Sequence, residues 1–125
     1  MALKKIRLEL ARTKDFPNGS RTHGYELVAP LTGLGSLDPE EWKSQREHCR
    51  VRRFWDGEAD EVGHLVHRPG GSWSFHYDIH GDASTDEAGY RFSAERFVPG
   101  EYVSIMEQDD EMRTFRVITV TDLQG

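Results

Sequence analysis

The stretch VGHLVHRPGGSWSFHYDIH, residues 62–80, decides the fold. Two predicted strand segments, 62–68 and 72–80, flank the turn sequence Pro69-Gly70-Gly71, and apolar and polar residues alternate in the second. Such alternation is typical of strands with one buried face, and glycine supplies the positive φ that tight hairpin turns require. The stretch therefore predicts an antiparallel hairpin. Its apolar face, which we expect in the core, carries Trp73, Phe75, Tyr77 and Ile79.

Outward from this hairpin, the same pattern or a β-branched composition predicts further strands at 4–12, 25–29, 49–55, 90–98, 102–107 and 112–120. The sequence Asp38-Pro39-Glu40-Glu41 is typical of a helix start and predicts one short helix over 39–47. The acidic residues 82–88 predict a mobile loop. Seven to eight short strands and one short helix indicate a mainly β fold, a single antiparallel barrel or sandwich.

Length and composition narrow the class of protein. The 125 residues predict one β-rich domain over 1–125, and a net charge of −6 argues against binding nucleic acid through its phosphates. No apolar run is long enough for a membrane helix or a secretion signal, so we expect a cytoplasmic protein with no membrane partner. The single cysteine, Cys49, excludes an internal disulfide, and we expect it to be buried and inert.

Four of the six histidines lie in the central hairpin, and the register of the hairpin decides which of them meet. A two-residue turn places His67 beside Ser74 and diagonal to His76. A three-residue turn instead places His64 directly opposite His76. In either register Asp78 lies two residues beyond His76 on the polar face of the strand.

Imidazole and carboxylate groups that converge from two strands are suited to a divalent metal such as Zn, Fe or Mn, or to general-base catalysis. The candidate ligand-binding residues are therefore His64, His67, His76 and Asp78, and the candidate metal set is His76, Asp78 and His67, with His64 as the alternative to His67. His80 is about 13 Å from His76 along the strand and is too distant to share an ion. The competing interpretation is a solvated polar face, where such residues are common.

A second candidate is the run Arg50, Arg52, Arg53, Phe54 and Trp55, together with Arg46, which could bind an anion or single-stranded nucleic acid. The acidic residues at 56–61 favour an ion-paired surface instead. The chain contains none of the short motifs typical of nucleotide-binding loops, serine hydrolases or zinc proteases.

Residues 97–105, FVPGEYVSI, resemble a strand of ferredoxin-reductase-type flavin domains. That resemblance implies a following Arg-x-Tyr-Ser strand, where this chain has Arg113-Thr114-Phe115-Arg116. The stretches CRVRRFW, HLVHRPGG and RFVPGEYVSI resemble small bacterial proteins of unknown function. This resemblance implies no catalytic motif. We therefore expect a binding module for a small ligand or a protein partner, and the alternative is a metal-assisted or general-base enzyme that uses the hairpin histidines.

Overall fold

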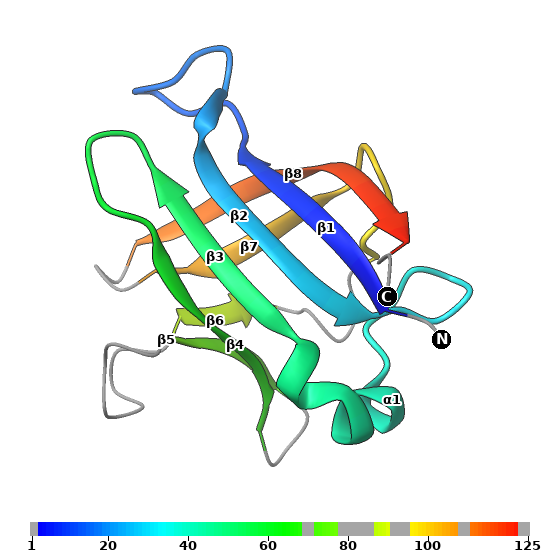
Figure 1. Ribbon diagram of the computed structural model, residues 1–125. Coiled ribbons are helices and arrows are strands. Elements are labelled where there is room, and N and C mark those ends of the chain that lie inside the picture. The colour runs from blue at the N-terminus through cyan, green and yellow to red at the C-terminus, as the bar shows by residue number, and fades with distance from the viewer. Residues whose placement is uncertain (1–2, 69–71, 78–86, 91–95, 108–110, 123–125) are drawn as a thin grey trace.

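In the computed structural model, the described residues are 3–68, 72–77, 87–90, 96–107 and 111–122. They form the strands β1 (Leu3–Leu10), β2 (Ser20–Pro30), β3 (Arg50–Trp55), β4 (Glu61–His67), β5 (Trp73–Tyr77), β6 (Glu87–Tyr90), β7 (Tyr102–Met106) and β8 (Met112–Asp122). Each strand pairs antiparallel with the next, and β8 pairs with β1 to close a barrel (Figure 1). The expected mainly β fold is confirmed, and of the two architectures it is the barrel.

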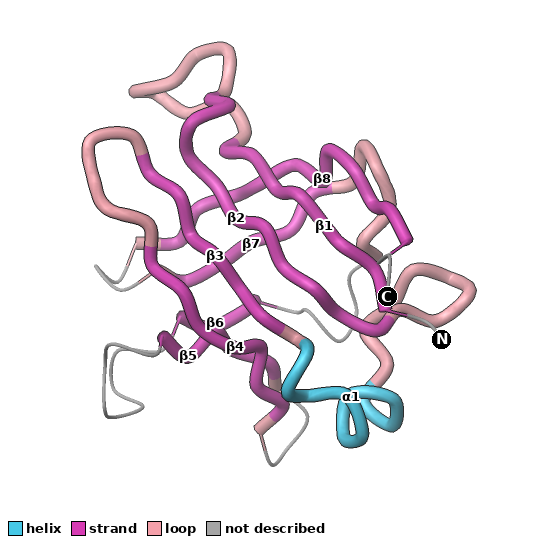
Figure 2. Tube along the Cα trace, viewed as in Figure 1, coloured by secondary structure: helices cyan, strands magenta, loops and turns pink. Residues whose placement is uncertain are grey.

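One end of the barrel is covered by the helical segment between β2 and β3, and we call it the helix end (Figure 2). The α-helix α1 (Pro39–Gln45) runs into a 3₁₀ turn, η1 (Arg46–His48). Asp38 caps α1 as predicted, because its carboxylate accepts hydrogen bonds from the backbone N–H groups of Glu40 and Glu41 at 3.1 and 3.2 Å. Trp42 of α1 is buried and donates its indole N–H to the carbonyl of Leu65 in β4 at 3.0 Å.

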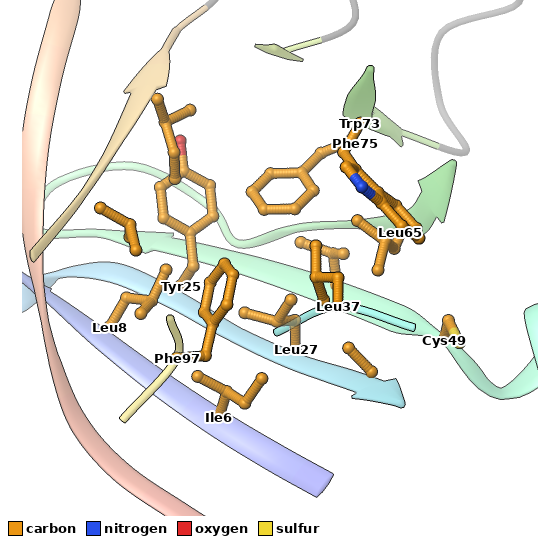
Figure 3. Close-up of a cluster of buried hydrophobic side chains, with 14 of the residues drawn as sticks. Ile6, Leu8, Tyr25, Leu27, Leu37, Cys49, Leu65, Trp73, Phe75 and Phe97 are labelled. Atoms are coloured by element: carbon orange, nitrogen blue, oxygen red, sulfur yellow. The ribbon is translucent and has the colours of Figure 1, made fainter. Parts of the chain in front are cut away.

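Large side chains fill the interior of the barrel (Figure 3). Tyr25 lies against Phe75 and Phe115, with ring centroids 5.3 and 5.1 Å apart. Phe97 lies outside the described strands but is buried in the same core, and its backbone N–H donates to the carbonyl of Gly35. The predicted core face of β5 is confirmed for Trp73, Phe75 and Tyr77, and Ile79 lies outside the described residues.

Two elements differ from the sequence prediction. Strand β2 begins at Ser20 rather than at residue 25, because a register shift in β1 between Glu9 and Leu10 lets the chain pair earlier. Strand β6 covers Glu87–Tyr90, where the sequence predicted the end of a loop followed by a strand from 90 to 98. These four residues form a strand because their backbone pairs with β5 and β7, although apolar and polar residues alternate only weakly among them. The rest of the predicted loop, 82–86, lies outside the described residues.

Candidate functional site

The hairpin of β4 and β5 adopts the second of the two predicted registers. His64 lies directly opposite His76, and Leu65 lies opposite Phe75. Residues opposite each other on paired strands share a face, so His64 and His76 both lie on the outer face of the barrel. The sequence alternative with the three-residue turn therefore predicted the pairing of His64 with His76.

His67, by contrast, lies on the other face of the sheet from His76. It pairs with Trp73, and the two rings pack at 4.3 Å, with Trp42 at 5.9 Å from His67. The two-residue-turn register that placed His67 beside Ser74 is therefore wrong, because the pairing is shifted by one residue and such a shift moves every side chain to the opposite face.

The polar face around His64 contains a competing donor. Arg50 donates from Nη1 to Nε2 of His64 at 2.9 Å, so this arrangement occupies the lone pair that a metal would use. Asp78, the third member of the predicted set, lies outside the described residues. Among the residues that the structure describes, no three His, Cys, Asp or Glu side chains are placed to hold a metal ion.

The arginine run in β3 forms ion pairs, as the acidic neighbours suggested. Arg52 contacts Glu26 and Asp60, and Arg53 contacts Glu58 at 3.3 Å. Phe54 is buried on the outer face beneath the guanidinium groups of Arg7 and Arg52. Cys49 is fully buried, and burial raises the pKa of its thiol to about 11, so the thiol stays protonated and inert as expected.

Sequence reasoning missed a buried carboxylate at the end of the barrel opposite the helix, which we call the hairpin end. The side chain of Glu107, just after β7, is 1% exposed. It accepts hydrogen bonds from the hydroxyl of Tyr25, from Nε of Arg53 at 3.2 Å and from Nη1 of Arg113 at 2.7 Å. We call these four residues the Glu107 cluster. A buried charge of this kind is tolerated because its neighbours donate to it and carry opposite charge.

An aromatic layer lies beside the Glu107 cluster. The indole of Trp55 lies under the guanidinium of Arg53, which is 4.3 Å from the ring centroid. The ring of His23 meets Trp55 edge-on at 4.5 Å and packs on Phe16 of the β1–β2 loop at 4.6 Å. Burial lowers the pKa of His23 and is the largest effect; Asp56 opposes it, Arg53 lowers the pKa further, and Glu58 and Glu107 oppose it more weakly. His23, which the sequence left without a role, therefore packs as a neutral ring.

On the outside of the barrel, a hollow of about 1120 Å³ lies between the β1–β2 hairpin and strands β7 and β8. We call it the arginine hollow, because Arg12, Arg21 and Arg116 line it. Its other lining residues are Glu9, Leu10, Ala11, Asn18, Gly19, Ser20, Tyr102 and Ile118. All three arginines are exposed, and none forms an ion pair with a carboxylate among the described residues.

Among the described residues that line the arginine hollow, the one acidic residue, Glu9, is already paired with an arginine. Glu9 accepts a hydrogen bond from Nε of Arg7 at 2.7 Å, and only 17% of its side chain is exposed. Arg7 also binds Glu26 at 3.0 Å, and its Nη2 donates to the carbonyl oxygen of Arg21 at 3.0 Å. The local charge presented to solvent is therefore positive, in a chain whose net charge is −6.

Irregularities in two strand pairings create the arginine hollow. The pairing of β1 with β8 shifts between Arg7 and Leu8, so that Ile118 is passed over, and the pairing of β1 with β2 shifts between Glu9 and Leu10. Gly19 has φ of +75°, and a Cβ there would lie 2.7 Å from the carbonyl oxygen of Leu10. Only glycine fits both conditions. The turn sequence Asn18-Gly19 was the one sequence signal for this site.

The chain matches no protein-family model, no curated protein and no solved structure. Among the described residues, no helix combines the length and apolar character that crossing a bilayer requires.

Proposed function

We propose that this protein is a binding module for a small anionic ligand, which the arginine hollow holds through Arg12, Arg21 and Arg116. The observation that supports the proposal is that three exposed arginines without carboxylate partners among the described residues line one concave surface. The guanidinium group binds phosphate and carboxylate oxygens in pairs, which makes arginine the usual residue for recognising such groups.

The contrast with four other arginines of the sheet strengthens this proposal. Arg7, Arg52, Arg53 and Arg113 each contact a carboxylate within 3.3 Å. Three arginines that have no carboxylate partner within the described part of the chain and that gather around one hollow carry an energetic cost of mutual repulsion. A bound anion would remove that repulsion, and the ligand would therefore also stabilise the fold.

The packed interior favours this outer site over a ligand inside the barrel. Tyr25, Tyr77, Phe75, Phe97 and Phe115 are each less than 2% exposed and fill the space in which other barrels hold their ligands. Since small ligands bind in concave surfaces with a few convergent polar groups, the arginine hollow is the better candidate in the part of the chain that the structure describes.

Isothermal titration calorimetry with inorganic pyrophosphate tests the proposal. We expect the wild type to bind with an affinity that falls as salt is raised. Arg116→Ala and Arg21→Ala should each weaken binding about tenfold, which corresponds to about 1.4 kcal/mol. The matched control is Lys43→Ala, which removes one positive charge from the exposed surface of α1. Equal weakening in the control, or no binding by the wild type, would contradict the proposal.

A metal site at His64 and His76 is the second candidate function, because these two side chains do lie opposite each other on the outer face. A metal there would displace Arg50 from Nε2 of His64, with Asp78 as the further predicted ligand. Zinc should then raise the thermal midpoint of the wild type but not of His76→Ala. An equal shift in both proteins would remove the support for this candidate and for an enzyme based on these histidines.

A further inference from the structure

Beside its three arginines, the arginine hollow has an apolar part that the binding of a simple anion would leave unused. Tyr102, Ile118, Leu10 and Ala11 form this part. Tyr102 is 57% exposed, although large aromatic side chains are usually buried in this fold. An aromatic ring held open in a concave surface offers a face on which a planar ligand can stack.

The position of Tyr102 places this ring next to the positive charge. Tyr102 of β7 lies directly opposite Arg116 of β8, so the two side chains project from neighbouring strands on the same face. Ile118, which the pairing with β1 passes over, lies two residues beyond Arg116 along β8. A single ligand can therefore contact the aromatic ring and the guanidinium group together.

The size and the remaining polar groups of the arginine hollow also favour a ligand larger than a simple anion. A volume of about 1120 Å³ lies slightly above the usual range of small-molecule sites and far exceeds the need of one phosphate. The amide of Asn18 lines the hollow and makes no hydrogen bond with the described residues, so it is available to a sugar hydroxyl or a base edge.

From this arrangement we infer that the ligand of the arginine hollow is a mononucleotide, whose base stacks on Tyr102 and whose phosphate binds Arg116 and its neighbouring arginines. The inference rests on the proposed anion-binding function and adds the chemical class of the ligand. Stacking on an aromatic side chain tolerates any base, so the stacking itself discriminates nucleotides from other phosphates rather than one base from another.

Calorimetry with adenosine monophosphate and ribose 5-phosphate tests the inference. Both ligands carry a phosphate of the same charge, but only the nucleotide carries a base. We expect the nucleotide to bind about tenfold more tightly to the wild type. Tyr102→Leu should abolish that preference and leave the affinity for ribose 5-phosphate unchanged. Tyr102→Phe keeps the ring and should retain the preference.

The possible failures are distinguishable. Equal affinity of the wild type for the two ligands, or an unchanged preference in Tyr102→Leu, would overturn the nucleotide inference and leave anion binding intact. Failure of the wild type to bind pyrophosphate, ribose 5-phosphate and the nucleotide would overturn both. In the bound state, the ring resonances of Tyr102 should shift with the nucleotide but not with ribose 5-phosphate, and shifts of equal size would count against stacking.

Discussion

The chain places arginines in two very different surroundings. In the Glu107 cluster, Arg53 and Arg113 are largely buried and converge on one carboxylate, whereas Arg12, Arg21 and Arg116 face solvent around the arginine hollow. The first arrangement uses the positive charge to hold strands β2, β3, β7 and β8 together at the hairpin end. The second arrangement leaves the positive charge exposed to solvent, where a ligand can reach it. The difference teaches that the surroundings of an arginine, more than its presence, separate a structural role from a binding role.

Of the substitutions that test this comparison, Glu107→Gln should cause the largest loss of stability. The variant keeps the shape of the side chain but leaves Arg53 and Arg113 without their shared charge, and we expect the free energy of unfolding to fall by about 3–5 kcal/mol. Urea denaturation measures it. The matched control is Glu58→Gln, because Glu58 binds the same Arg53 from an exposed position and should cost less than about 1 kcal/mol. Similar losses in both variants would mean that burial does not decide the strength of these pairs.

A smaller loss is expected from Tyr25→Phe. The substitution keeps the ring in the core and removes the hydroxyl that donates to Glu107. A hydrogen bond to a charged group contributes about 1.5–3 kcal/mol, and the variant should lose that amount of unfolding free energy. Tyr102→Phe, at an exposed tyrosine, provides the control and should change stability by no more than about 0.5 kcal/mol. If Tyr25→Phe left the free energy of unfolding unchanged, the Tyr25 hydroxyl would contribute nothing to the stability of the Glu107 cluster.

The sequence predicted what depends on neighbours along the chain. The alternation in 72–80 identified the buried face of β5, and Asp38-Pro39 identified the start of α1, because both signals act within a few residues. The alternation also brought His64 and His76 into consideration as a pair. It could not choose the register, because that choice depends on packing outside the hairpin, such as that of Trp73 against Trp42.

The sequence could not predict what depends on distant strands. Tyr25 and Glu107 are 82 positions apart in the sequence, and their contact exists only because the barrel closes. Closure also brings Arg12 and Arg21 next to Arg116, and the register shifts that open the arginine hollow leave no trace in the alternation. Histidine density drew attention to the central hairpin, while the arginines of the hollow are spread over the sequence and gave no local signal.

A pH-dependent effect should appear at the hairpin end. The pKa of His23 is lowered in the folded protein by burial, so the unfolded chain takes up a proton near pH 6.5 before the folded chain does. Stability should therefore fall as the pH drops below about 6.5, until the folded protein is protonated as well. Urea denaturation at several pH values should show that His23→Gln loses part of this pH dependence. Parallel curves for wild type and variant would show that His23 contributes nothing to it.

The smallest effect on stability should come from the arginine hollow itself. Arg116 is exposed and forms no ion pair among the described residues, so Arg116→Ala should change the free energy of unfolding by no more than about 0.5 kcal/mol. The same variant should show a smaller rise in thermal midpoint with pyrophosphate than the wild type, because the stabilisation by a ligand grows with the logarithm of its concentration divided by its Kd. Arg113→Ala should behave in the opposite way, with a large loss of stability, because it removes a partner of the buried Glu107. If Arg116→Ala instead destabilised the protein as strongly as Arg113→Ala, both groups of arginines would be structural, and the distinction on which the binding function rests would fail.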